Sequence, residues 1–280
     1  MGEVVLAAGV PHAPYFPRLI EREGPEHPVA RLFRRVAHEF ELASPDLLVV
    51  FDSDHFVNFF FDNLPTFAVG VVEMATGPAE TNRSMPSYRV AVDRASASSL
   101  ADYAVDMGFD VASCEALRLD HSVLVPLHFL TPRMDLPILP VFVRGMAEPL
   151  PRAGRCLGLG QMVGRFLQAE LPRSLRVAVL ASGSISLEIG GPRMGMVDRA
   201  WVDDVAGWLA AGDVEALVGA ATPARMAAAG NAGGELLNWL ALLGSLGSLP
   251  LRPAFVETDF QPEGAPREGD AYAVWRPGDR

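Results

Sequence analysis

The sequence predicts an α/β fold: a single domain over residues 1–280, with a central mixed β-sheet flanked by helices on both faces. Apolar, strand-like runs alternate with amphipathic helical patterns along the chain. The strand-like runs are apolar at consecutive positions, which is typical of strands covered by helices on both sides. No Pro/Gly/Ser-rich linker, charge run or low-complexity block divides the 280 residues.

Each expected element has its own pattern. Runs rich in Val, Leu, Ile and Phe predict strands over 3–10, 46–52, 66–73, 138–145, 176–183 and 251–259. Apolar residues spaced three and four apart predict helices over 28–42, 87–108, 157–170, 197–218 and 234–247. Residues 146–156 and 261–270 are expected to form surface loops.

Charge and hydropathy exclude several partners. The formal net charge of −11 argues against nucleic acid and anionic membranes, which require basic surfaces. The most apolar window, 232–249, is interrupted by glycines, Glu235 and Asn238, so we expect no membrane span. The first residues, MGEVVLAAGV, lack the basic segment of a signal peptide. We therefore expect a cytoplasmic protein, with Cys114 and Cys156 as reduced thiols.

The absence of lysine narrows the chemistry. All 23 basic side chains are arginines, which excludes Schiff-base catalysis and the phosphate-binding lysine of a P-loop. The glycines of LGLGQMVG follow no predicted strand, so nucleotide binding is not expected. ASGSIS lacks the GxSxG pattern of a serine hydrolase.

Two histidines follow predicted strands. His12 lies in GVPHAPYFP after the first strand, and His55 lies in FDSDHFVNFFFD after the second. Reactive groups in such folds usually lie just beyond strand ends. A turn histidine is the alternative for His12. Unpaired buried polar groups destabilise a fold, so the polar residues at the end of the second strand are expected to have a specific role.

Glu235 is the only charged residue in the window 232–249. A carboxylate beginning so apolar a helix is either solvated, stabilised by the helix dipole or bound to a cation. Together with two histidines it would complete the two-His-one-carboxylate face that binds Fe(II). His121 and His128 in DHSVLVPLHF would share one face of a helix, with backbone-bonded structural histidines as the alternative.

Five segments in order resemble the class III extradiol ring-cleavage dioxygenases, the family of the protocatechuate 4,5-dioxygenase β subunit. They are GVPHAP, DSDHFVNFFFDNLPTFAVG, LDHSVLVPL, SGSISLEIGGPR and NAGGELLNWL, and the resemblance covers nearly the whole chain. It implies Fe(II)-dependent extradiol cleavage of a catechol-type ring by O2, with His12, His55 and Glu235 as iron ligands. It also implies an acid–base role for His121. The phenylalanines after His55 would then form a dry wall of the pocket.

The resemblance also implies the partners. These are a small aromatic diol, carboxylated or not, or an aminophenol, together with O2, in a homo-oligomer or a hetero-oligomer with a small second subunit. Arg193 is a candidate partner for a substrate carboxylate, because a guanidinium fork fits one.

One position departs from the family pattern. Where family members usually read S/T-G-G-x-S-H, this chain has Leu187 in place of the histidine, and leucine cannot transfer protons. His128 is therefore a second acid–base candidate beside His121. The alternative function is a non-catalytic or supporting subunit of a hetero-oligomeric dioxygenase, and an unrelated metal-dependent hydrolase on the same scaffold is a third hypothesis.

Overall fold

A mixed β-sheet forms the centre of the computed structural model, which describes residues 2–80, 85–260 and 268–277. Within these residues the sheet has nine strands, in the order β10-β11-β1-β8-β2-β7-β3-β6, with β9 paired to β11. The strands are β1 (Glu3–Val10), β2 (Leu47–Asp52), β3 (Phe67–Gly70), β6 (Ala112–Cys114), β7 (Ile138–Val143), β8 (Arg176–Ser182), β9 (Ser186–Leu187), β10 (Phe255–Phe260) and β11 (Glu268–Trp275). A separate pair consists of β4 (Met74–Gly77) and β5 (Tyr88–Ala91).

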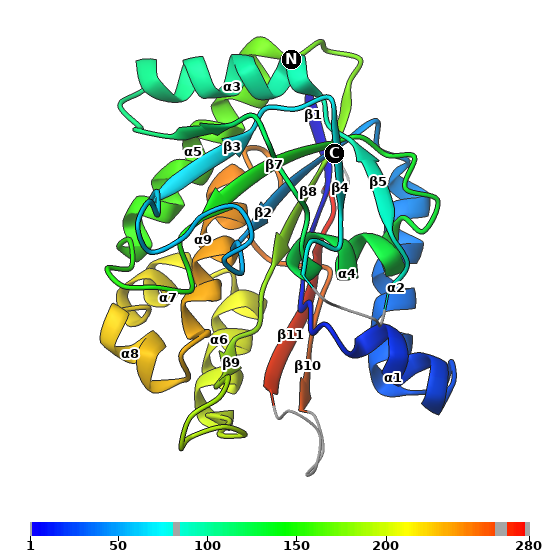
Figure 1. Ribbon diagram of the computed structural model, residues 1–280, viewed down its shortest axis with the longest axis vertical. Helices are drawn as coiled ribbons and strands as arrows, with labels where there is room; N and C mark the ends of the chain where they lie inside the picture. The colour runs from blue at the N-terminus through cyan, green and yellow to red at the C-terminus, as the bar shows by residue number, and fades with distance from the viewer. Residues whose placement is uncertain (1, 81–84, 261–267, 278–280) are drawn as a thin grey trace.

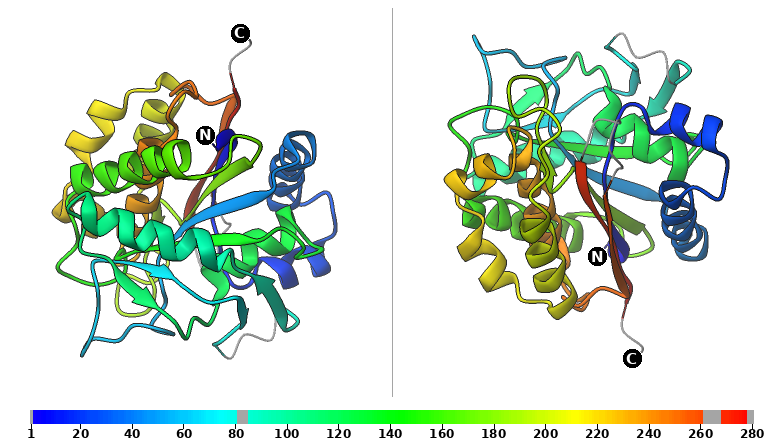
Figure 2. Two further views of the ribbon diagram at one scale, coloured as in Figure 1. Left: turned by 90° about the horizontal axis from the view of Figure 1, so that it is seen from above. Right: turned by 90° about the horizontal axis from the view of Figure 1, so that it is seen from below.

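Helices cover both faces of this sheet, as Figures 1 and 2 show. One layer contains α1 (Phe16–Glu23), α2 (Pro28–Ala43) and α4 (His121–Leu130). The other contains α3 (Arg94–Asp106), α5 (Ala153–Glu170), α6 (Arg199–Ala211), α7 (Val214–Ala220), α8 (Pro223–Ala228) and α9 (Leu236–Ser245), the last preceded by a 3-10 turn, η1 (Gly233–Glu235). The predicted α/β fold with a mixed, doubly covered sheet is confirmed.

The strands are buried on both faces because their side chains alternate between the two layers. In β2, Leu47, Val49 and Phe51 pack in one core, and Leu48 and Val50 pack in the other. A strand with two apolar faces reads as one continuous apolar run, which is why the sequence identified it. Among the described residues, no helix is both long and apolar enough to cross a membrane.

Four neighbouring strands, β1, β8, β2 and β7, run parallel to one another. Val10 pairs with Ser182, and Phe51 pairs with Ala181, so β1, β8 and β2 end at the same edge of the sheet. The segments that follow these strands therefore meet in space. This edge contains the site described below.

Several predicted boundaries are wrong. The helix expected over 87–108 is strand β5 followed by α3, whose start is fixed by Asp93 accepting a hydrogen bond from Ser96 N. The helix expected over 197–218 is interrupted at Gly212, which adopts φ 70°. α5 begins at Ala153, inside one expected loop. In the other expected loop, residues 268–270 belong to the buried strand β11, and residues 261–267 lie outside the described residues.

Helices α5 and α9 approach each other closely through glycines. A methyl group on Gly160 would overlap the backbone oxygen of Ala241, and one on Gly244 would overlap the backbone oxygen of Leu157. Gly160 and Gly164 of LGLGQMVG therefore belong to a helix-packing surface, since a Cβ at either would meet a backbone oxygen of α9. This contact fixes α9, which directly follows Glu235.

Replacing Gly160 by alanine should lower the free energy of unfolding by about 1–3 kcal/mol, because the added methyl forces the two backbones apart. Gly158→Ala is the matched control in the same helix. A Cβ there would meet only Phe109 Cζ at 3.6 Å, so the helix propensity of alanine should stabilise the protein by about 0.5–1 kcal/mol. Urea denaturation measures both. Equal effects of the two substitutions would contradict the packing role.

Candidate metal centre

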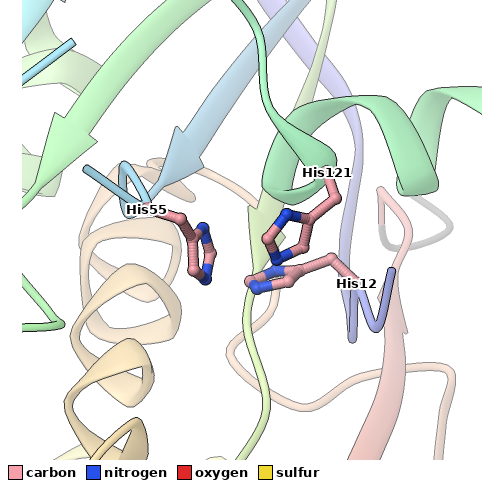
Figure 3. Close-up of side chains that lie close together, drawn as sticks. All are labelled: His12, His55 and His121. Atoms are coloured by element: carbon pink, nitrogen blue, oxygen red, sulfur yellow. The ribbon is translucent and has the colours of Figure 1, made fainter. Parts of the chain in front are cut away.

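The sheet edge brings together four of the side chains predicted from the sequence. His12 lies two residues after β1, His55 lies three residues after β2, and His121 is the first residue of α4. Glu235 ends η1 and directly precedes α9, the apolar helix predicted to start near it. Figure 3 shows the three imidazole rings turned toward one another. One ring nitrogen from each of His12, His55 and His121 lies within 4.8 Å of the other two.

The carboxylate of Glu235 closes the cluster. Its Oε1 atom lies 3.1 Å from His12 Nε2 and 3.3 Å from His55 Nε2. Its Oε2 atom accepts a hydrogen bond from the backbone N–H of Ser184 at 2.8 Å. The side chain of Glu235 is fully buried, so Oε1 has to be stabilised from within the cluster.

The tautomer of His12 follows from its second partner. Ser182 Oγ donates its single hydrogen to the backbone oxygen of Ser122 at 2.5 Å. Toward His12 Nδ1, which is 2.8 Å away, the same oxygen can only accept. His12 therefore carries its hydrogen on Nδ1 and directs the lone pair of Nε2 at Glu235.

His55 Nδ1 also donates to an acceptor outside the cluster, in this case the carboxylate of Asp120. Its Nδ1 and its backbone N–H both donate to Asp120 Oδ2, at 3.3 and 2.8 Å. Burial would raise the pKa of Asp120, but the neighbouring His55 holds the pKa of this carboxyl well below its usual range. An ionised Asp120 keeps hydrogen on His55 Nδ1. When the ring is neutral, the lone pair of His55 Nε2 therefore also faces Glu235 Oε1.

Two imidazole lone pairs and a carboxylate oxygen converging on one point repel one another unless a cation lies between them. Without a metal, a proton can relieve this repulsion: burial lowers the pKa of His55, but Asp120 and Glu235 raise it well above its ordinary value. Burial would likewise raise the pKa of Glu235, which His12 and His55 hold below its usual range. Two imidazoles and one carboxylate with fixed outer partners are a donor set that fits a divalent transition metal.

The polar end of β2 has a role at each position. Asp54 accepts hydrogen bonds from the backbone N–H groups of Val57, Asn58 and Phe59, which shape the turn after His55. Ser53 Oγ donates to the backbone oxygen of Val143 at 2.9 Å. Burial, with the charges of Asp120 and Asp54, raises the pKa of Asp52, which therefore meets Ser122 Oγ at 3.1 Å as a neutral acid.

His121 and His128 are separated by the structure. The ring of His121 lies 4.1 Å from that of His55 between centroids, and its Nδ1 lies 3.0 Å from Glu80 Oε1. Burial and the neighbouring His55 lower the pKa of His121, which favours the neutral imidazole. His128 lies two turns further along α4, where its Nδ1 lies 2.5 Å from Tyr88 Oη. The structure does not bring His128 into the cluster.

Leu187 and Arg193 are both fixed near the segment that carries Glu235. Leu187 lies in β9, and its backbone oxygen accepts a hydrogen bond from Ala232 N at 3.1 Å. Arg193, the candidate partner of a substrate carboxylate, donates to Glu188 Oε2 at 2.8 Å. Its guanidinium is therefore already paired within the protein.

The phenylalanines after His55 form only part of the expected wall. Phe59 packs against Phe142 with ring centroids 4.8 Å apart, beside a cavity of about 20 Å³ that is lined by Asp120 but by none of the clustered histidines. Phe60 and Phe61 are 53% and 79% exposed. The prediction of a dry wall is wrong for these two residues, because the turn held by Asp54 directs them outward.

Sequence reasoning missed the residues that orient the ligands: Ser182, Asp120, Ser122 and Glu80. Three of them lie in segments quoted for the family resemblance, and the DH pair of LDHSVLVPL was the available signal for Asp120. Their partners are distant along the chain, at separations of 170 residues for Ser182 and His12 and 65 residues for Asp120 and His55. These residues come into contact only when the strand ends meet at one edge of the folded sheet.

Replacing Ser182 by alanine should weaken divalent metal binding by about 10–100-fold, because His12 loses the acceptor that fixes its tautomer. Ser245→Ala is the matched control, since this serine is equally buried but donates within α9 to Leu242 O. Titration with Co(II) in competition with a chelator measures both affinities. Identical affinities in the two variants would refute the role of Ser182.

Comparisons with known proteins agree with this arrangement. The 2,3-dihydroxyphenylpropionate/2,3-dihydroxicinnamic acid 1,2-dioxygenase of Photorhabdus laumondii is 34% identical over 176 residues, which are 62% of this chain and 53% of that protein. The corresponding dioxygenase 2 of Pseudomonas putida is 32% identical over 180 residues, 64% of this chain and 55% of that protein. The chain thus spans about half the length of the curated relatives it matches.

A crystal structure of an uncharacterized protein from Escherichia coli K12 has the same fold, with a TM-score of 0.54, 14% identity and coverage of 96% of this chain and 99% of that one. The family described as the catalytic LigB subunit of aromatic ring-opening dioxygenase matches residues 6–267. This match includes His12, His55, His121 and Glu235. The chain belongs to the LigB family of aromatic ring-opening dioxygenases, the class III extradiol family.

Proposed function

We propose that this protein is an Fe(II)-dependent extradiol dioxygenase that opens a catechol-type ring, with His12, His55 and Glu235 as the iron ligands. The observation that carries this proposal is the position of Glu235 Oε1, within 3.3 Å of two imidazole Nε2 atoms whose lone pairs face it. Fe(II) held by two histidines and one carboxylate supplies open positions at which an aromatic diol and O2 can react.

The side chains around these ligands have separate tasks. Asp120 and Ser182 hold the two histidines in the tautomer that presents Nε2. His121, whose ring is next to that of His55, is the group that takes a proton from the substrate hydroxyl and later returns it. Because the relatives are named for 2,3-dihydroxyphenyl acids, we propose an ortho-diol with a small substituent, or an aminophenol, as the substrate class.

The supporting-subunit hypothesis is favoured by one observation, Leu187 in place of the usual histidine. Against it stands the ligand set, in which each histidine has its own hydrogen-bond partner. A chain that only supports an active partner has no need for that arrangement. For assembly we propose a homo-oligomer or a hetero-oligomer with a small second subunit. The free thiols of Cys114 and Cys156 support a reducing, cytoplasmic location.

The purified protein should bind about one Fe(II) per chain and consume O2 with at least one member of a panel of catechols and aminophenols. His12→Ala, His55→Ala and Glu235→Ala should each abolish both properties. His38→Ala, on the exposed face of α2, is the matched control and should keep both. Iron analysis, oxygen-electrode measurements and circular dichroism provide the readouts. Iron retained in all three folded ligand variants would refute the ligand assignment, and iron binding without O2 uptake would favour the supporting subunit.

His121→Phe should lower turnover by about 10²–10⁴-fold while leaving iron bound, because the acid–base group is lost and the ligands remain. His128→Phe is its counterpart on the same helix. It should be nearly silent, because His128 lies two turns from the cluster beside Tyr88. Steady-state O2 uptake compares the two variants. A large loss in His128→Phe would restore His128 as the substitute for the missing histidine.

Leu187→His tests the family position directly. A histidine restored there should change turnover or its pH profile if the position faces the substrate. The measurement is O2 uptake over a range of pH for the variant and the parent. Unchanged profiles would show that position 187 no longer takes part in the chemistry.

A further inference from the structure

Glu80 contacts His121 at two points. Its Oε1 atom accepts from the backbone N–H of His121 at 2.9 Å and from His121 Nδ1 at 3.0 Å. A single oxygen that binds both the main chain and the ring of one residue fixes the ring relative to its own backbone. Because Nδ1 donates, His121 carries its hydrogen there, and Nε2 retains the lone pair.

The segment that carries Glu80 is attached to the residues just before α4. Leu119 N donates to Thr76 O at 2.9 Å, and Ala79 N donates to Leu119 O at 2.8 Å. Gly77 makes this approach possible, because a methyl group there would overlap the backbone oxygen of Leu119. Glu80 is therefore held in register with His121 by main-chain bonds on the preceding residues.

The bond of Glu80 to His121 N caps the start of α4, but capping does not account for its contact with His121 Nδ1. The N-cap of this helix is Asp120, whose Oδ1 atom already accepts from Ser122 N at 2.7 Å. Glu80 Oε2 is buried and has no hydrogen-bond partner among the described residues, so placing this carboxylate here costs free energy. The hydrogen bonds of Oε1 to the backbone N–H at the helix start and to the imidazole together offset this cost.

We propose that Glu80 is a positioning residue for His121. Glu80 holds the His121 ring in the Nδ1–H tautomer, so that Nε2 can exchange a proton with the substrate. This inference rests on the proposed dioxygenase function. Positioning of His121 matters especially in this chain, because Leu187 occupies the place of the usual second acid–base histidine. With one proton carrier left, a ring that rotated or changed tautomer would have no substitute.

The tautomer can be measured without any activity. In the full chain labelled with 15N-histidine, without added metal and at mildly alkaline pH, the His121 signals are assigned by their loss in His121→Phe. We expect the Nδ1–H tautomer in the parent and in Glu80→Gln, whose amide oxygen still accepts both hydrogen bonds, and a shift toward the Nε2–H tautomer in Glu80→Ala. An Nε2–H tautomer in the parent, or no shift in Glu80→Ala, overturns the inference.

Turnover gives a second readout with catechols as probes. With Fe(II) bound, Glu80→Ala should lower kcat by about 10-fold or more, a part of the 10²–10⁴-fold acid–base contribution, and Glu80→Gln should recover most of it. KM and iron content should change by less than about 2-fold. Glu73→Ala, at a highly exposed glutamate just before β4, is the control that should leave all values unchanged.

The two readouts separate the possible failures. A parent protein that binds iron but consumes no O2 refutes the proposed function, and the tautomer measurement still decides the role of Glu80. Active Glu80→Ala with unchanged kcat overturns the positioning role. A lower melting temperature in Glu80→Ala with unchanged tautomer would reduce Glu80 to a structural residue, which also overturns the inference.

Discussion

A fully buried carboxylate faces the lone pairs of two imidazole rings, and the rest of the site depends on how that repulsion is relieved. Glu235 Oε1 lies 3.1 and 3.3 Å from the two Nε2 atoms, and its other oxygen is bound to a backbone N–H. Burial of an uncompensated charge is among the most expensive arrangements in a protein. A cation at the common point turns the same geometry into a favourable one, which is why the outer partners of both histidines matter.

Three consecutive residues at the start of α4 serve three different parts of the site. Asp120 binds His55, His121 enters the cluster itself, and the backbone oxygen of Ser122 holds Ser182, which in turn holds His12. Both histidines proposed as metal ligands are thus oriented from one short segment. A displacement of this helix end would disturb both of them and the proposed acid–base group together.

The sequence was sufficient for those features that depend on local patterns. The strand at residues 3–10 and the parallel strand that ends at Ser182 were predicted because continuous apolar runs identify strands buried on both faces. Strand β11 was missed because Glu268 and Asp270 interrupt its apolar pattern, although both are buried.

The ligands His12, His55 and Glu235 were proposed from motif order and resemblance, and the structure brings their side chains together. The pairings of Ser182, Asp120 and Glu80 with their histidines could not be predicted, although the DH pair marked Asp120 itself, because the contacts join residues 170, 65 and 41 positions apart. Nothing in the local sequence encodes such pairs. They arise only when the ends of β1, β8 and β2 meet at one edge of the sheet.

The four side chains of the cluster are unequally exposed to solvent, which affects how fast ions and small molecules can exchange with it. The side chains of His12 and Glu235 are 3% and 0% exposed, whereas those of His55 and His121 are 14% and 13% exposed. The side of the cluster formed by His55 and His121 is therefore the one more open to ions and small molecules. Substitutions beside His55 and His121 would alter how fast an ion or small molecule arrives and departs, while the buried half of the site, anchored by the close fit of α5 and α9, keeps its geometry.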